Sequence, residues 1–251
     1  LSFKYTSNLR ENALTVWESL LDSVVINKPA LVINHNTGER EIMVQDASNA
    51  LYLINSTGRI VWKMKLSNPI MSEIYQVDYY SNGKLQYLFN TKEAIHLIDR
   101  NGNYVERYPV KLRSDATNGI ALFDYDKNHD YRIFIATENR KIYAYDMEGN
   151  LITGWTFGKT EGKVSKAVQH FRLGEKDYIV ISDNIRTYIL NRRGQERVEI
   201  KNQKIPSLKN NYSLSINIES DNPQLISTDL YGNVYGIDFN GNVNNLLDNE
   251  A

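Results

Sequence analysis

One short segment recurs five times along this chain, and no other feature limits its fold as strongly. Each copy is a run of apolar and aromatic residues, followed by Asn or Asp and, three residues later, by Gly. The copies are LYLINSTG (51–58), IHLIDRNG (95–102), IYAYDMEG (142–149), TYILNRRG (187–194) and VYGIDFNG (234–241). Their glycines follow one another at intervals of 44, 47, 45 and 47 residues. A period near 45 is typical of a propeller blade and is too long for leucine-rich or TPR repeats.

The chemistry of the repeat predicts a strand that ends in a tight turn. Apolar and aromatic residues favour the strand, the Asn or Asp side chain caps the turn, and Gly supplies the positive φ that closes it. Three more β-rich runs accompany each copy; around the first they are ALVIN (30–34), IMV (42–44) and RIVWKMKL (59–66). Four strands per period predict an all-β fold, a β-propeller of four-stranded blades.

The repeats also predict where the blades begin and end. We expect five whole blades within one domain, at about 27–68, 69–113, 114–159, 160–205 and 206–251. The outer strands of the second and third are expected in NYVERYPVKL (103–112) and NLITGWTF (150–157). Trp17 precedes Trp62 by 45 residues, so residues 1–26 are expected to form outer strands of a preceding blade. We therefore expect part of a longer chain, with a ring closed by the N-terminal piece as the alternative.

Composition excludes several classes of protein. Of the 251 residues 41% are hydrophobic, which is enough for a packed core. The 29 basic and 30 acidic residues give a net charge of −1, which argues against a basic nucleic-acid-binding arm and an acidic tail. No run reaches the 18 or so apolar residues of a membrane span. The absence of cysteine excludes disulfides, thiolate metal sites and Cys nucleophiles.

Two stretches carry a family resemblance. The LINSTGRIVW stretch, with Gly58 and Trp62 four residues apart, resembles the PQQ-type (quinoprotein-like) and WD40-like propeller repeats. The segment FDYDKNHDYRIFIATENRKIYAYDMEGNLITGW (123–155) resembles repeats of large uncharacterised envelope proteins of Bacteroidetes-type bacteria. The resemblance implies a propeller fold and an extracytoplasmic location, in the periplasm or cell envelope. The chain is short for an eight-bladed quinone-dependent dehydrogenase and lacks the vicinal cysteines that many of them have.

One loop has the pattern of a calcium site. Alternate oxygen-bearing side chains can converge on a hard cation, and the loop resembles those of integrin-type FG-GAP repeats. Two positions depart from the calcium pattern: His129 stands where Gly is expected and Arg132 where an acidic residue is expected. An Asx-rich hairpin turn without any cofactor is the other interpretation. The candidate ligands are Asp124, Asp126, Asn128 and Asp130.

The sequence gives little support to catalysis. It holds no GxSxG, no HExxH and no glycine-rich phosphate loop between a strand and a helix. His96 occupies the strand position that Tyr fills in the other four copies, so packing explains it best. An enzyme acting on carbohydrate at the propeller channel is the alternative function, with Glu73, Asp115 and His170 as candidate catalytic residues.

Basic residues gather in the predicted connections between blades. A basic rim around the channel mouth would attract an anionic partner, although solvated loop lysines are the simpler explanation. Aromatic residues do not alternate with these basic ones, so we expect no nucleic-acid binding. The prediction is a non-catalytic recognition or scaffolding module for a protein or glycan partner. Its candidate binding residues are Lys111, Arg113, Lys163, Lys166, Lys204 and Lys209.

Overall fold

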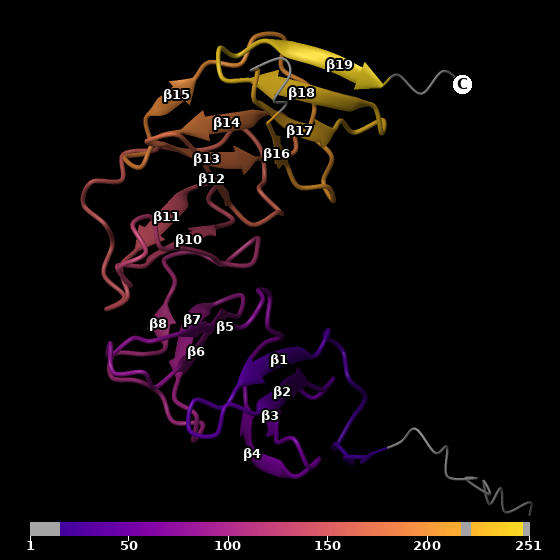
Figure 1. Ribbon diagram of the computed structural model, residues 1–251, viewed down its shortest axis with the longest axis vertical. Coiled ribbons are helices and arrows are strands. Elements are labelled where there is room, and N and C mark those ends of the chain that lie inside the picture. The colour runs from indigo at the N-terminus through magenta and orange to yellow at the C-terminus, as the bar shows by residue number, and fades with distance from the viewer. Residues whose placement is uncertain (1–15, 217–221, 248–251) are drawn as a thin grey trace, which may run out of the picture. The chain divides into compact units, whose positions relative to one another are not determined.

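The computed structural model describes residues 16–216 and 222–247, and all their regular elements are β-strands. These strands form five antiparallel sheets (Figure 1). In each sheet the strands lie side by side in chain order, as expected for blades. The chain divides into two compact units, Leu1–Leu66 and Ser67–Ala251.

The N-terminal unit holds one four-stranded sheet. Its strands are β1 (Ala30–Ile33), β2 (Arg40–Gln45), β3 (Ala50–Ile54) and β4 (Ile60–Lys65). Every residue of β3 is buried, and the strand has a sheet neighbour on each side, β2 and β4. Val44, Ala50, Tyr52 and Ile54 form its core cluster, against which Trp17 packs.

The C-terminal unit holds four sheets. The first contains β5 (Tyr75–Val77), β6 (Gln86–Asn90), β7 (Ala94–Ile98) and β8 (Val110–Lys111). The second contains β9 (Ala121–Phe123), β10 (Arg132–Ala136) and β11 (Ile142–Tyr145). The third contains β12 (Gln169–Leu173), β13 (Lys176–Ser182), β14 (Thr187–Leu190) and β15 (Glu196–Val198). The fourth contains β16 (Ser213–Ser215), β17 (Gln224–Thr228), β18 (Val234–Asp238) and β19 (Val243–Leu247).

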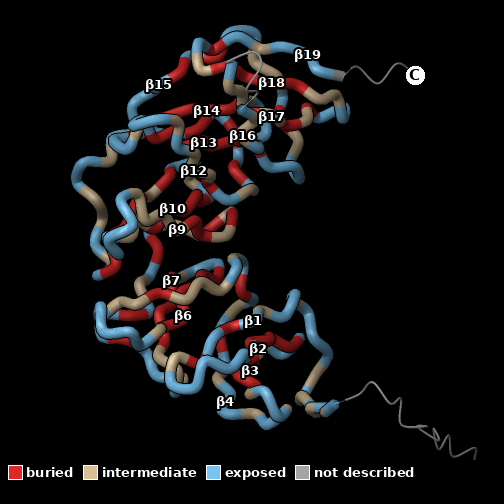
Figure 2. Tube along the Cα trace, viewed as in Figure 1, coloured by how far each residue is buried: buried red, intermediate tan, exposed pale blue. Residues whose placement is uncertain are grey.

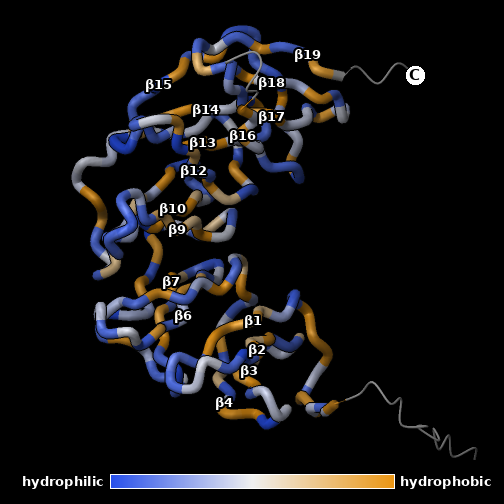
Figure 3. Tube along the Cα trace, viewed as in Figure 1, coloured by the Kyte–Doolittle hydropathy of each residue, from blue (hydrophilic) through white to orange (hydrophobic). Residues whose placement is uncertain are grey.

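The cores of this unit lie between successive sheets. One cluster joins Leu88 and Leu97 of the first sheet to Ile133 and Ile135 of the second. Similar clusters join the second sheet to the third and the third to the fourth. The second and third strands of each sheet are accordingly the most buried (Figure 2) and carry the apolar runs (Figure 3). Each sheet thus depends on its neighbours to cover its faces, as in repeat proteins.

The structure confirms the predicted turn in all five repeats. The glycine N–H donates to the carbonyl oxygen of the Asn or Asp three residues earlier, at 2.9–3.2 Å. Every one of these glycines has φ between 77° and 84°. The Asn or Asp side chain accepts further backbone N–H groups; Asp238 Oδ1, for example, accepts those of Asn240 and Asn242. The repeat therefore fixes the end of each third strand.

One expected strand is missing. The sequence predicts NLITGWTF (150–157) as the outer strand of the third blade, but this sheet has three strands. Two isolated bridges, Tyr145 with Leu151 and Lys141 with Lys159, lie along the edge where a fourth strand would pair. The chain turns back where the N–H of Trp155 donates to the oxygen of Ile152. The Trp155 indole N–H then donates to Ile142 O at 2.8 Å, so a side chain satisfies an edge carbonyl that a fourth strand would have paired.

The second blade also has a shorter outer strand than expected. Within NYVERYPVKL (103–112), only Val110 and Lys111 pair as strand β8, and a lone bridge joins Tyr104 to Ile98. At the N-terminus, residues 1–15 lie outside the described residues. Residues 16–26 have a single bridge, Val25 with Asp46, and the Ser19 hydroxyl donates to Gly58 O. The blade boundaries and the number of blades remain predictions.

Candidate functional site

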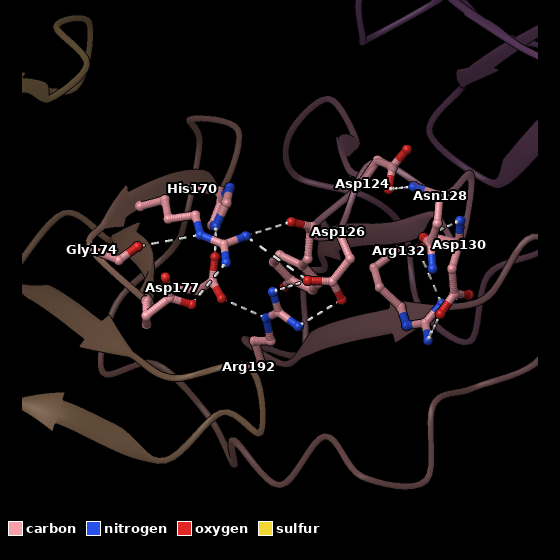
Figure 4. A network of polar contacts seen from close by, with 12 residues as sticks. Asp124, Asp126, Asn128, Asp130, Arg132, His170, Gly174, Asp177 and Arg192 are labelled. Atoms are coloured by element: carbon pink, nitrogen blue, oxygen red, sulfur yellow. Dashed lines mark hydrogen bonds and ion pairs between the residues drawn. The ribbon is translucent and has the colours of Figure 1, made fainter.

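Two carboxylates from different sheets hold one arginine at the turn end of the third sheet of the C-terminal unit (Figure 4). Arg192, in the turn between β14 and β15, donates from Nε to Asp177 Oδ2 of β13 at 2.6 Å. Its two terminal nitrogens donate to Asp126, in the loop between β9 and β10, at 2.8 and 3.0 Å. The bonds to Arg192 lower the pKa of Asp126 despite partial burial. This arginine therefore ties two neighbouring sheets together.

The second oxygen of the Asp177 carboxylate, Oδ1, contacts a histidine. His170 Nε2 lies 2.7 Å from Asp177 Oδ1, and the Asp177 side chain is only 5% exposed. The guanidinium of Arg192 lies over the ring of Tyr125, 4.5 Å from its centre. Burial raises the pKa of Tyr125 well above its usual range. Its buried hydroxyl has no hydrogen-bond partner in the structure.

Two hollows adjoin this network and share Asp126 and Arg192 in their linings. The first is a cavity of about 200 Å³ whose walls also include the aromatic residues Tyr125, Phe134 and Trp155. The second is a wider cleft of about 450 Å³ with four arginines in its lining. We call them the aromatic cavity and the arginine cleft. The cleft arginines are Arg172, Arg192, Arg193 and Arg197.

This site was not predicted from the sequence, although the repeat contains a signal for it. The two residues between the Asn or Asp and the Gly of the turn are ST, RN, ME, RR and FN in the five copies. Only the fourth copy has two arginines there, Arg192 and Arg193. The partner carboxylates could not be found in this way, because Asp126 is 66 residues away from Arg192 in the chain.

The four predicted calcium ligands lie in one loop but have different hydrogen-bond partners. Asp124 accepts the backbone N–H groups of Asn128 and His129 at 3.0 Å. Asp126 binds Arg192, as described above, and Asp130 binds the guanidinium of Arg132, with one contact at 2.7 Å. Among the described residues, no three acidic or histidine side chains are grouped so as to hold a metal ion. A calcium ion here is a proposal that requires both guanidinium groups to withdraw.

The three candidate catalytic residues have separate partners. Asp115 pairs with Lys92 at 3.1 Å, and His170 with Asp177 at 2.7 Å. Glu73, in the connection before β5, accepts the Ser72 hydroxyl at its backbone oxygen. The recorded contacts thus do not bring these three side chains together.

The predicted basic rim is partly neutralised. Lys163 pairs with Glu138 at 2.7 Å. Lys166 donates to Asn210 O at 2.7 Å, and burial lowers its pKa. Lys204 and Lys209 lie in the connection between β15 and β16 that Lys166 reaches. The remaining two, Lys111 in β8 and Arg113 just after it, are exposed.

Exposed apolar side chains accompany two of these lysines. The N–H of Leu230, in the loop between β17 and β18, donates to Ile205 O of the β15–β16 connection at 2.9 Å. Tyr231 is 78% exposed, and the other three are 42–52% exposed. Lys204 and Lys209 flank the group in sequence. The patch, which we call the apolar patch, consists of Ile205, Leu208, Leu230 and Tyr231.

In two sheets of the C-terminal unit, a side chain of the third strand bonds the residue that follows the second strand. In the third sheet of the C-terminal unit, the Tyr188 hydroxyl donates to Asp183 Oδ2 at 3.1 Å. In the first, His96 takes the place of the tyrosine and its Nε2 bonds Thr91 Oγ1 at 3.0 Å. His96 is buried, stacks on Phe89 and has its pKa lowered to about 4 by burial. These contacts give His96 a packing role in the core, as expected from its position in the repeat.

In the part of the chain that the structure describes, no helix could cross a membrane. No protein-family model matches the sequence. No curated protein matches it either.

Solved structures, by contrast, resemble the chain over most of its length. BBS1N in complex with ARL6DN has a TM-score of 0.58 at 12% identity, with 88% of this chain and 66% of that chain covered. The V. cholerae biofilm matrix protein Bap1 gives 0.58 at 14% identity, covering 91% and 41%. The Neurospora crassa Pan2 WD40 domain gives 0.51 at 13% identity, covering 86% and 64%. The chain thus spans less than two thirds of each of these structures, and the similarity shows a propeller-like, WD40-like fold.

Proposed function

We propose that the protein is a non-catalytic recognition module whose apolar patch binds a protein partner. The exposure of four large apolar side chains on two adjoining loops is the observation that carries this proposal. Apolar surface gathered in this way on rigid loops is typical of protein-binding sites. A protein partner is also what BBS1N, one of the similar structures, has in ARL6DN.

The charges around the patch support an acidic partner. Lys204 and Lys209 flank the apolar side chains, and Lys166 reaches the same connection through Asn210. An apolar centre with a charged rim is the usual arrangement of a protein interface, because the rim keeps its water while the centre loses it. Rim charges steer the encounter and contribute less to affinity than the buried anchors.

A non-catalytic role is supported by the separate partners of Glu73, Asp115 and His170. The proposal includes an extracytoplasmic location, which the similarity to the biofilm matrix protein Bap1 supports. It also includes five blades of the PQQ-like type in one propeller domain, in line with the repeat spacing.

The test compares two leucines of similar exposure. Leu208→Glu places a charge in the apolar patch, whereas Leu246→Glu places it on the outer strand β19, where the leucine is 41% exposed. Each purified protein is used as bait in an extract of the source cells, and bound proteins are quantified by mass spectrometry. We expect one or a few proteins to be retained by the native and Leu246→Glu forms and lost with Leu208→Glu. Equal recovery with all three baits would overturn the proposal.

A further inference from the structure

The arginine cleft has more positive charge than its own carboxylates neutralise. Arg192 is held by Asp126 and Asp177, and Arg172 lies 3.8 Å from Glu175. Among the described residues, Arg193 and Arg197 have no ion-pair partner, and both are exposed. The Arg197 guanidinium lies over the ring of Tyr178, 5.4 Å from its centre. Arginine binds carboxylates through two parallel hydrogen bonds, so guanidinium groups without a carboxylate partner on one cleft favour an oxyanion ligand.

The aromatic cavity beside it requires a ligand of another kind. Its walls combine Trp155 and Phe134 with two carboxylates, Asp126 and Asp130, and with the guanidinium of Arg132. The unpartnered hydroxyl of Tyr125 belongs to the same lining. An apolar side chain in this cavity would displace the water that hydrates these polar groups and would offer them no hydrogen bonds in its place. A pyranose ring presents both a C–H face for the aromatic walls and hydroxyls for the carboxylates, the arginine and Tyr125.

We propose that the aromatic cavity and the arginine cleft together bind a uronic-acid residue of an acidic polysaccharide. The sugar ring occupies the cavity, and its carboxylate lies on Arg193 and Arg197. The two hollows share Asp126 and Arg192, so one residue of a sugar chain can reach both. Asp177, which also contacts His170, holds the Arg192 side chain in place before the ligand arrives. Less side-chain freedom is therefore lost on binding, which lowers its entropic cost.

The carboxylates in the lining exclude more highly charged ligands. Asp126, Asp177 and Glu175 would repel successive phosphates of a nucleic acid, while a uronate carries a single charge per ring. An acidic peptide can satisfy the arginines but offers few hydroxyls to Asp126, Asp130 and Tyr125. The site is separate from the apolar patch, because the two adjoin opposite ends of β14. Thr187, at the start of this strand, bonds Gln203 of the β15–β16 connection, whereas Asn191 and Arg192, just after its end, line the cleft. This inference therefore stands independently of the proposed function.

Binding is measured by isothermal titration calorimetry with oligouronates of galacturonate, mannuronate and glucuronate. A neutral galactose oligomer and oligo-glutamate are the comparison ligands. We expect one oligouronate to bind at least about tenfold more tightly than either comparison ligand, a difference of about 1.4 kcal/mol. Tighter binding of oligo-glutamate would identify a peptide site and overturn the proposal, and so would the absence of binding by all three oligouronates.

Three variants locate the ligand. Arg193→Gln/Arg197→Gln is expected to weaken oligouronate binding about tenfold or more. Tyr125→Phe removes only the unpartnered hydroxyl, so we expect the melting temperature to be kept while the affinity falls severalfold. Arg59→Gln, an exposed arginine in another turn, is the control and should change neither. Native affinity in the double-arginine variant, or in Tyr125→Phe, would overturn this placement of the sugar.

Discussion

Arg192 Nε donates to Asp177 Oδ2 at 2.6 Å, and this bond attaches the turn after β14 to the buried face of β13. The same carboxylate meets His170 at 2.7 Å. Asp177 is thus a buried charge satisfied from two sides, while Asp126, the other partner of Arg192, is 56% exposed. The two carboxylates should therefore differ in what they contribute to stability.

Asp177→Asn is expected to lower the free energy of unfolding by about 2–4 kcal/mol, because the loss of a buried partner leaves Arg192 and His170 poorly satisfied. Asp126→Asn should cost less than about 1 kcal/mol, as is usual for an exposed ion pair. Urea unfolding followed by fluorescence measures both. Equal losses of unfolding free energy in the two variants would show that the buried carboxylate contributes no more to stability than the exposed one.

Two glycines with the same backbone conformation but different surroundings give a second prediction. Gly241 (φ 84°) and Gly38 (φ 76°) both lie in the left-handed region. A Cβ on Gly241 would clash with the carbonyl oxygen of Glu199, whereas one on Gly38 would meet open space. Gly38→Ala should cost about 1 kcal/mol from backbone strain alone. Gly241→Ala should cost clearly more, since a backbone oxygen must move.

Thermal melts of the two alanine variants decide this second prediction. Similar melting temperatures would contradict the close packing of the Gly241 turn on the segment after β15. A larger drop for Gly241→Ala would support it.

Stability should fall with acid in two steps. Burial lowers the pKa of His96 to about 4, from 6.5, so the unfolded chain takes up a proton that the folded protein refuses between these values. Burial of Asp46 is outweighed by hydrogen bonds from Ser48, Tyr52 and the N–H of Ala50, which lower its pKa from 3.8 to about 2. Its stabilising contribution is complete above about pH 4 and is lost as the pH falls toward 2.

Melting temperatures measured across this pH range check both steps. His96→Phe should flatten the curve between about pH 6.5 and 4, and Asp46→Asn should flatten it below about pH 4. If a variant leaves the melting temperatures in its own pH range unchanged, the replaced side chain is not the group that titrates there.

The loop of Asp124 provides a test of its own. Asp124 accepts two backbone N–H groups, so Asp124→Ala should destabilise the protein by about 1–2 kcal/mol whether or not an ion binds. If the proposed calcium ion binds, millimolar calcium should raise the melting temperature of the native protein and not that of Asp124→Ala. If calcium does not shift the melting temperature of the native protein, the loop binds no calcium ion and is a structural turn.

The sequence was informative where a local signal repeats. The Asn or Asp and Gly of each turn, together with the β-rich runs around it, were sufficient to predict the order of strands and the ends of the third strands. The missing outer strand at 150–157 was not predictable in this way, because its residues are good strand formers. Its loss depends on the reversal at Ile152 and on the bond from Trp155 to Ile142, which only the folded chain brings together.

The candidate sites were less predictable than the fold. Lys204 and Lys209 were identified from charge, but the apolar patch between them depends on Ile205 meeting Leu230 across 25 residues of sequence. The arginine cleft likewise depends on Asp126 and Arg192, which lie in the turns of two different sheets. Charge and periodicity describe one segment at a time, whereas both sites form between segments.

Site-specific photo-crosslinking can detect a protein partner at the apolar patch itself. A photoreactive phenylalanine replaces Tyr231 in the patch or, as the control, Tyr80, which is 54% exposed in the turn after β5. After irradiation in an extract of the source cells, we expect a discrete adduct of higher mass from position 231 and none from position 80. Adducts of equal yield from both positions, or none from position 231, would contradict the proposed binding at the patch.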